Sequence, residues 1–173
     1  MHDTLTKPRA KKPSGTGSTR GKRRPWGVHR TSGVVNFCVH GPSCKIAASD
    51  FTPAKLIEAL RIGLPVRELD DLQATLAVPL EKLVPLLGIS KATLHRRKAG
   101  GRLGPAESDR VVRFARLMGK AVEVLESEQN ARQWLTSPQF GLGGAAPLAY
   151  AETEVGAREV EDLLGRIEHG VYS

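Results

Sequence analysis

From residue 50 onward, apolar residues recur every three or four positions, which is the spacing of a helix that buries one face. Gly or Pro separates these segments, and Ser or Thr stands where several of them begin, as expected of helix caps. The 173 residues give room for one ordinary domain, or for a small domain with a tail. The chain is therefore predicted to be all-α. The expected helices span residues 52–62, 67–77, 80–87, 91–98, 105–125, 128–137 and 153–168.

The stretch from Pro79 to Lys98 has the pattern of two short helices joined by a sharp turn. Its first half ends at Gly88, which can adopt the left-handed backbone conformation that such a turn requires. Ser90 can then cap a second helix whose outward side chains are mostly basic. This combination is typical of a helix-turn-helix, and an αα-hairpin with a merely solvated basic face is the alternative. Pro85 removes one helical hydrogen bond, which predicts a kinked first helix or a later start.

In a helix-turn-helix, the second helix enters the major groove with its N-terminal side chains at the base edges. The candidate DNA contacts are Ser90, Lys91, Thr93, Arg96, Arg97, Lys98 and Arg102. We predict base contacts from Lys91, Thr93 and Arg96. The remaining basic side chains are better suited to phosphates. Ser90 and the neighbouring backbone N–H groups can meet a phosphate at the helix N-terminus.

Charge is distributed unevenly along the chain. Residues 1–30 hold nine basic residues and one acidic residue, so this segment accounts for the whole net charge of +8. Residues 82–120 hold ten basic and two acidic residues, whereas residues 121–173 hold three basic and nine acidic residues. We expect the basic middle to meet phosphate and the acidic end to meet a different partner. The arginines between residues 110 and 116 are expected to extend the basic surface.

The longest expected helix, at 105–125, carries an apolar stripe that is predicted to be core, with a dimer seam as the alternative. The first expected helix is predicted to turn Ile57 and Ile62 inward with its leucines. Gly165 lies inside the last expected helix, where glycine costs ~1 kcal/mol relative to alanine. That cost predicts close packing of Gly165 against a neighbour.

The first 49 residues are expected to form a disordered or loosely ordered basic tail. Residues 1–33 have too few apolar side chains to offset the entropy lost on folding. They are either a solvated tail or a basic arm that adds nonspecific phosphate contacts. Residues 34–48 are ambiguous, and a short strand is one interpretation. Their two cysteines and one histidine match no standard zinc spacing, so we expect no metal site there.

The sequence disfavours several classes of protein. No apolar run approaches the ~20 residues of a membrane helix, and no apolar stretch follows the basic N-terminus as in a secretory signal. Two cysteines make no disulfide scaffold and favour a reducing, cytoplasmic setting. The Gly-Leu-Gly-Gly stretch at 141–144 follows no predicted strand, which disfavours a nucleotide site. The five histidines are scattered and form no catalytic set, so we expect neither an enzyme nor a cofactor.

Four blocks of sequence, in this order, carry a family resemblance. They are LIEALRIGLP, LLGISKATLHRRKAGGRLGPAESDRVVRFARL, ARQWLTSPQFGLGGAAPL and TEVGAREVEDLLGRIEHGVYS. With these blocks the chain resembles the antitoxins of RES–Xre type II toxin–antitoxin systems, the group with the Xre/MbcA/ParS toxin-binding C-terminal domain. The resemblance covers roughly residues 52–173 and does not include the tail before residue 50.

The resemblance implies a domain organisation and two partners. Residues 50–126 would form a helix-turn-helix domain that dimerises and binds operator DNA, and residues 127–173 would form a toxin-binding domain. The toxin would be a RES-domain protein that degrades NAD⁺, and the antitoxin would also repress its own operon. The residues facing the toxin would be Gly141, Gly143, Gly144, Arg166, Glu168, His169, Val171 and Tyr172. The alternative is a stand-alone helix-turn-helix regulator, for which an acidic final helix has no evident use.

Overall fold

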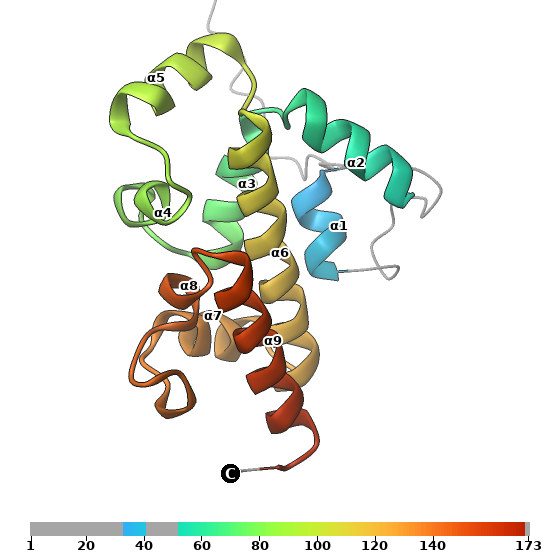
Figure 1. Ribbon diagram of the computed structural model, residues 1–173, viewed down its shortest axis with the longest axis vertical. Coiled ribbons are helices and arrows are strands. Elements are labelled where there is room, and N and C mark those ends of the chain that lie inside the picture. The colour runs from blue at the N-terminus through green and yellow to red at the C-terminus, as the bar shows by residue number, and fades with distance from the viewer. Residues whose placement is uncertain (1–32, 41–51, 172–173) are drawn as a thin grey trace, which may run out of the picture. The chain divides into compact units, whose positions relative to one another are not determined.

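The computed structural model describes residues 33–40 and 52–171, and their regular structure is helical (Figure 1). The all-α prediction is therefore confirmed. The helices in these two ranges are α1 (Val34–His40), α2 (Pro53–Ile62), α3 (Arg67–Leu76), α4 (Leu80–Leu86), α5 (Lys91–Gly100), α6 (Pro105–Leu125), α7 (Glu128–Thr136), the short 3-10 turn η3 (Phe140–Leu142), α8 (Pro147–Tyr150) and α9 (Glu154–Glu168). None of these helices is long and apolar enough to cross a membrane. The disorder expected at residues 1–32 falls outside the described residues.

Most helix ends follow from local sequence. The side chains of Thr52, Ser127 and Thr153 cap α2, α7 and α9, each accepting a hydrogen bond from a backbone N–H in the first helical turn. The expected helix ends lie within one residue of the observed ones except in α5, which continues to Gly100 where a loop was predicted from residue 99. Gly101 then ends α5 in the left-handed conformation that glycine adopts without strain.

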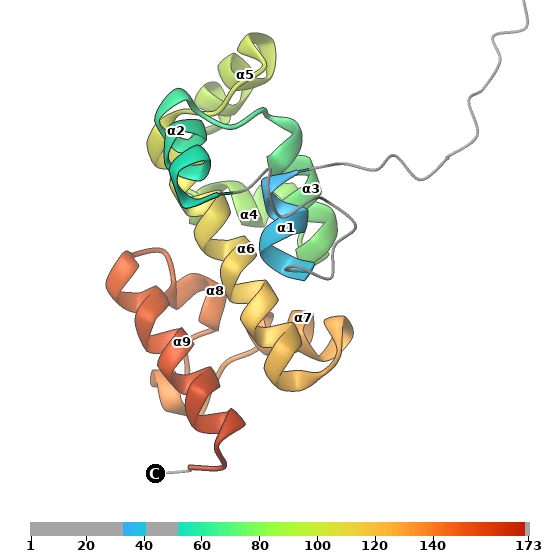
Figure 2. The same cartoon turned by 90° about the vertical axis from the view of Figure 1, so that its right-hand side faces the viewer.

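α6 is the element around which the described residues pack. It contacts α1, α2, α3, α7 and α9 (Figures 1 and 2). Val111, Phe114, Ala115 and Met118 of the predicted stripe are fully buried, and so is Leu117 on another side of the helix. Burying one large apolar side chain stabilises a fold by ~1.5–3 kcal/mol, so α6 contributes a large share of the core.

α1 is a helix, so the interpretation of this segment as a short strand is wrong. It buries Val34, Val35 and Val39, and it packs on α6 and α3. This part of the expected loose tail therefore belongs to the core. α1 approaches α6 most closely at Gly119, where a Cβ atom would lie 2.3 Å from the carbonyl oxygen of Cys38.

A buried carboxylate holds the N-terminal end of α1. Glu68 in α3 is 2% exposed, and its Oε2 accepts a hydrogen bond from the backbone N–H of Val35 at 3.0 Å. Burial raises the pKa of the Glu68 carboxyl above its usual value, and the hydrogen bond from Val35 opposes that rise only in part. Glu68 is thus a polar link between α3 and α1 within an otherwise apolar contact.

α2 packs less completely than the sequence predicts. Ile57 and Ile62 are 51% and 59% exposed, so the prediction that both point inward is wrong. Leu56 and Leu60 are half-buried against the core instead. The helix lies on the surface of α6 and contributes one narrow apolar edge to the core.

Close packing at Gly165 is also not found. No atom of the described residues lies within 4 Å of the position that a Cβ atom of Gly165 would occupy. The close approach on α9 is instead at Gly156, where a Cβ atom would lie 1.9 Å from the carbonyl oxygen of Tyr150. A glycine inside a helix suggests a close contact with a neighbouring element. Only the tertiary structure shows which glycine makes such a contact.

Gly119 and Gly165 form a matched pair for a test, because both lie inside helices and differ in their surroundings. Gly119→Ala is expected to lower the free energy of unfolding by ~1–3 kcal/mol, since its methyl group would collide with the α1 backbone. Gly165→Ala is expected to raise it by ~0.5–1 kcal/mol, since alanine restricts the unfolded chain and meets nothing in α9. Urea unfolding of both variants measures the two changes, and equal signs would contradict the placement of α1.

Glu68 predicts a pH dependence of stability. A carboxyl whose pKa is raised on folding stabilises the fold fully below its unfolded pKa, and this contribution is lost as the pH rises through the folded pKa. Glu68→Gln keeps an oxygen acceptor for Val35 but does not titrate. Relative to Glu68→Gln, the wild-type chain is therefore expected to lose stability as the pH rises from about 4.5 toward neutral. Urea unfolding across this range measures the difference, and a constant difference would refute the role given to burial.

Candidate functional site

The turn between α4 and α5 has the geometry that its sequence predicts. α4 starts where expected and Pro85 lies near its end, so the later start considered for this helix is wrong. Gly88 has a φ of +63°, and Ile89 at the corner is 4% exposed. The Oγ atom of Ser90 then caps α5 by accepting a hydrogen bond from the backbone N–H of Thr93 at 3.1 Å. A helix, a glycine turn and a capped second helix are all present.

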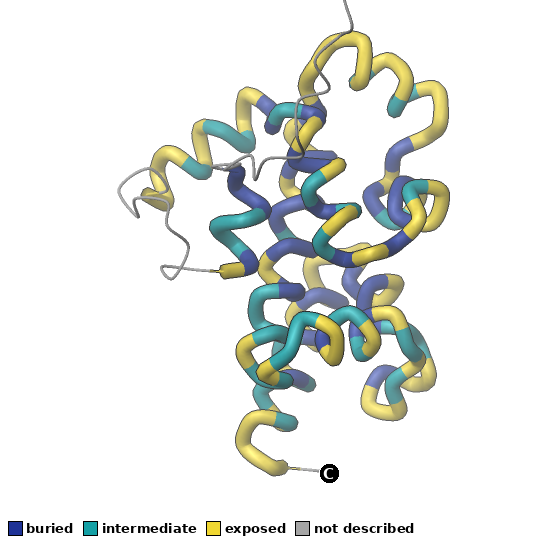
Figure 3. The backbone as a smooth tube through the Cα atoms, turned by 180° about the vertical axis from the view of Figure 1, so that it is seen from behind, coloured by how far each residue is buried: buried dark blue, intermediate teal, exposed yellow. Residues whose placement is uncertain are grey.

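α5 presents a basic face to solvent. None of its residues is buried, and in Figure 3 most of its backbone tube has the colour of exposed residues. Lys91, Arg96 and Lys98 are exposed, and we call these three residues the α5 basic face. His95 lies one helical turn from Lys91 on the same side and is also exposed. Three of the seven predicted DNA contacts are therefore accessible on α5.

Other predicted DNA contacts are used within the domain. Arg97 is half-buried, and its Nε lies 2.8 Å from Oε2 of Glu107 in the first turn of α6. Nη1 of Arg102 donates a hydrogen bond to a backbone carbonyl oxygen at the end of α2, at 2.7 Å. The hydroxyl groups of Ser90 and Thr93 lie 3.0 Å apart and are hydrogen-bonded to each other. These four side chains shape and hold α5, whereas the α5 basic face remains accessible.

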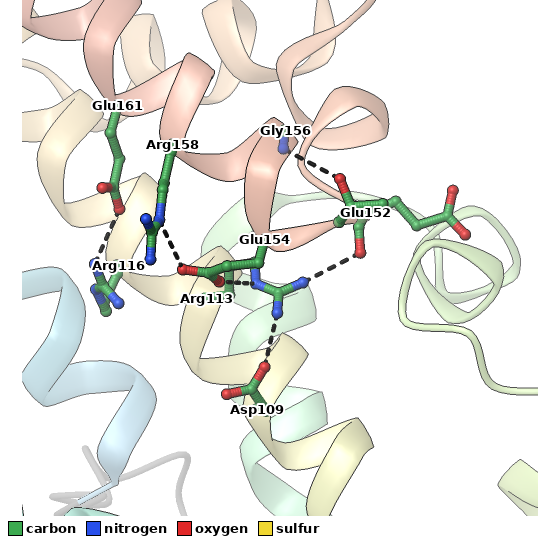
Figure 4. Close-up of polar contacts among 9 residues, drawn as sticks. Asp109, Arg113, Arg116, Glu152, Glu154, Gly156, Arg158 and Glu161 are labelled. Carbon is green, nitrogen blue, oxygen red and sulfur yellow. Dashed lines mark hydrogen bonds and ion pairs between the residues drawn. The ribbon is translucent and has the colours of Figure 1, made fainter.

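Three basic residues of α6, Arg113, Arg116 and Lys120, form ion pairs with acidic residues of α9. Arg113 is only 13% exposed and uses three nitrogen atoms (Figure 4). Its Nε and Nη2 pair with the carboxylates of Glu154 and Asp109 at 3.1 and 2.8 Å, and its Nη1 donates to the carbonyl oxygen of Glu152 at 3.1 Å. One arginine of α6 thus fixes the start of α9.

Two further ion pairs join α6 to α9. Arg116 pairs with Glu161 at 3.0 Å, and Lys120 pairs with Glu168 at 2.8 Å. We call these pairs and that of Arg113 with Glu154 the α6–α9 seam. Exposed pairs contribute ~0.2–1 kcal/mol each, so the seam sets the register of α9 more than it adds stability. Of the arginines predicted to extend the basic surface, Arg113 and Arg116 instead pair with α9, and Nη1 of Arg110 donates to the carbonyl oxygen of Leu87 at 3.0 Å.

The expected interface glycines shape the loop that follows α7. Gly143 and Gly144 have φ values of +64° and +85°, and the N–H of Gly144 donates to the carbonyl oxygen of Gln139 at 3.0 Å. Gly141 lets η3 approach α9, because a Cβ atom there would lie 2.8 Å from Cδ1 of Leu163. The three glycines therefore fold the loop back on itself and place it against α9.

The last turn of α9 brings together the other residues expected at the toxin interface. Arg166 is exposed, and its carbonyl oxygen accepts a hydrogen bond from the N–H of Val171 at 2.9 Å. Glu168 is held by α6 in the seam, and His169 is the exposed C-cap. Val171 is 54% exposed. Tyr172 lies outside the described residues.

The sequence analysis did not single out Phe140. This side chain lies at the start of η3 and is 99% exposed, which is unusual for a phenylalanine on a well-packed domain. An isolated aromatic residue has no periodicity, so helical spacing does not select it. Its position directly before three glycines was the available signal.

Two family models match the chain in the order of its elements. Residues 55–116 match the antitoxin Xre-like helix-turn-helix domain, which includes α4 and α5. Residues 120–170 match the antitoxin Xre/MbcA/ParS C-terminal toxin-binding domain, which includes η3 and α9. The two matched stretches meet within α6, so both use this helix.

Curated relatives extend the similarity over both domains. The protein named antitoxin Xre from Yersinia enterocolitica is 38% identical over 120 residues, covering 68% of this chain and 81% of that protein. Antitoxin Xre from Photorhabdus laumondii is 37% identical over 116 residues, covering 66% and 78%. Antitoxin Xre from Pseudomonas putida is 33% identical over 93 residues, covering 54% and 56%. The chain therefore belongs to the Xre family of antitoxins, which are not enzymes and combine a helix-turn-helix domain with a C-terminal toxin-binding domain.

Proposed function

We propose that this chain neutralises an NAD⁺-degrading RES-domain toxin through its C-terminal domain and represses its own operon through its helix-turn-helix. One observation supports both halves of the proposal. A single buried helix, α6, joins a helix-turn-helix with an accessible basic face to a toxin-binding domain that is fixed in register by the α6–α9 seam. The toxin class and the repression follow from the family resemblance.

The DNA-binding half of the proposal rests on the α5 basic face. Lys91 and Arg96 lie within the first two turns of α5, where side chains reach base edges when such a helix enters the major groove. Arginine and lysine suit guanine, whose O6 and N7 both accept hydrogen bonds. Lys98, two residues beyond Arg96, is placed for a phosphate. We propose that a homodimer presents two such helices to two half-sites of the operator.

The toxin-binding half of the proposal rests on α9 and the segment that follows it. The pair of Lys120 and Glu168 fixes the last turn of α9, and the backbone bond from Val171 to Arg166 sets the direction in which the chain leaves the helix. We propose that α9 and η3 dock on the toxin and that the chain end covers its NAD⁺ pocket. Such an inhibitor blocks access to the site and needs no chemistry of its own.

The DNA interface is tested by removing charges from the α5 basic face. Lys91→Ala and Arg96→Ala are each expected to weaken binding to the DNA upstream of the gene about tenfold, and to leave toxin binding unchanged. Arg158→Ala is the matched control, because it removes the same charge from an exposed position on α9. Fluorescence anisotropy at one fixed salt concentration measures the three affinities. Equal affinities for all three variants would contradict the assignment of α5.

The toxin interface is tested by removing residues 169–173. This truncation keeps all of α9 and the pair between Lys120 and Glu168, so the domain is expected to stay folded and to bind DNA normally. It is expected to release toxin activity, measured as growth arrest and loss of cellular NAD⁺ on co-expression. Full rescue of growth by the truncated chain would show that the end of the chain is not the inhibitory element.

Co-purification tests the proposed function directly. The tagged chain is expressed with its neighbouring reading frame, and the complex is analysed by size exclusion and mass spectrometry. NAD⁺ consumption is then measured before and after the complex is denatured and the partner refolded. A RES-domain partner that consumes no NAD⁺ in the complex but consumes it after separation supports the proposal. A chain that purifies only with DNA would favour the stand-alone regulator.

A further inference from the structure

Phe140 is an apolar side chain that the fold exposes rather than buries. It is 99% exposed, whereas Leu142 of the same 3-10 turn is 6% exposed and anchors the turn in the core. A large apolar residue at such a position does nothing for the packing of this domain. Exposed apolar side chains that lie together with a polar rim are typical of protein interaction sites.

The backbone around Phe140 is fixed by hydrogen bonds. The N–H of Gln139 donates to the carbonyl oxygen of Ala145 at 3.0 Å, and the N–H of Gly143 donates to that of Phe140, also at 3.0 Å. The side-chain amide of Gln139 donates to the carbonyl oxygens of Trp134 and Ser137 at 3.0 and 3.1 Å. The phenyl ring therefore stands on a preorganised turn, so a partner that binds it loses little entropy in ordering the loop.

The surface beside Phe140 is acidic. The next residue, Gly141, lies against Leu163 of α9, and Glu159 is the neighbour of Leu163 one turn earlier on that helix. Val155, Glu159 and Asp162 are exposed and share one face of α9 by their spacing. Within the described residues, Glu159 and Asp162 form no ion pair, in contrast to the three glutamates of the seam.

We propose that Phe140 is the apolar anchor of the toxin interface, and that it enters an apolar recess of the toxin bordered by lysine or arginine side chains. The occupant is the toxin because Phe140 and the acidic face of α9 both lie within residues 120–170, the toxin-binding domain. When the toxin covers the carboxylates of Glu159 and Asp162, which form no ion pair within the described residues, basic side chains of the toxin are needed to compensate their charge. This inference rests on the proposed function and adds the residue that contributes most to affinity.

The affinity of the full-length chain for the toxin tests the anchor. The toxin is the partner released from the purified complex and refolded, and isothermal titration calorimetry measures the dissociation constant. Phe140→Ala is expected to weaken binding roughly tenfold or more, as truncation of an aromatic anchor does. Its melting temperature and its affinity for DNA are expected to match those of the wild-type chain, because Phe140 packs against so little of the domain.

Ile62→Ala is the matched control for the anchor. Ile62 is a 59% exposed apolar residue of α2, outside the toxin-binding domain, so its truncation is expected to leave toxin affinity unchanged. Equal affinities of Phe140→Ala and the wild-type chain would overturn the inference and leave the proposed function standing. A wild-type chain that does not bind the toxin at all would overturn both.

The rate of association tests the charge of the recess. Asp162→Lys is expected to slow association with the toxin several-fold at low salt, and the effect is expected to shrink as salt is added. Glu58→Lys makes the same charge change on exposed α2 and is expected to have no such effect. Stopped-flow or surface plasmon resonance measures both rates. Faster association of Asp162→Lys, or equal slowing of both variants, would overturn the basic border of the recess.

Discussion

The burial of α6 is the constraint on which the other elements depend. α6 contacts five other helices, and Val111, Phe114, Leu117 and Met118 are fully buried, while three of its basic side chains lie along the seam with α9. Every neighbouring helix must therefore present an apolar edge to it, and α1 must also come within backbone contact at Gly119. Because the helix-turn-helix match ends and the toxin-binding match begins within α6, both functional regions share one rigid support.

The charges of the chain are arranged around the same helix. The excess of basic residues before residue 120 and of acidic residues after it looks, in the sequence, like two surfaces for two partners. Many of these charged side chains instead form ion pairs within the domain. Examples are the three contacts of Arg113 and the pair of Lys120 with Glu168. The charges left accessible are then more informative than the totals. Among them are the basic face of α5 and the acidic residues of α9 that form no ion pair within the described residues, on the two sides of α6 in the sequence.

Both candidate interfaces are preorganised by polar contacts that face away from the partner. Ser90 caps α5, and the ion pair of Arg97 with Glu107 ties this helix to the start of α6. Gln139 and the glycines after it fix the turn that exposes Phe140. In each case these contacts hold the backbone in place, while the accessible residues beside them are available to a partner. A support of this kind lowers the entropy lost on binding, because the recognition side chains are already in place.

The sequence by itself determined the seven longer helices from residue 52 onward, though not η3 or α8, because helical periodicity and the capping residues Thr52, Ser90, Ser127 and Thr153 are local signals. It also determined the turn at Gly88, since a sharp helix-to-helix turn needs a residue that tolerates positive φ. Tertiary structure alone decided that residues 34–40 are helical, because their apolar pattern suits a strand as well and the deciding contact is with Gly119. It likewise decided which arginines are free and that Phe140 is exposed. Ion pairing and solvent exposure depend on what lies opposite a side chain, and that information is not local.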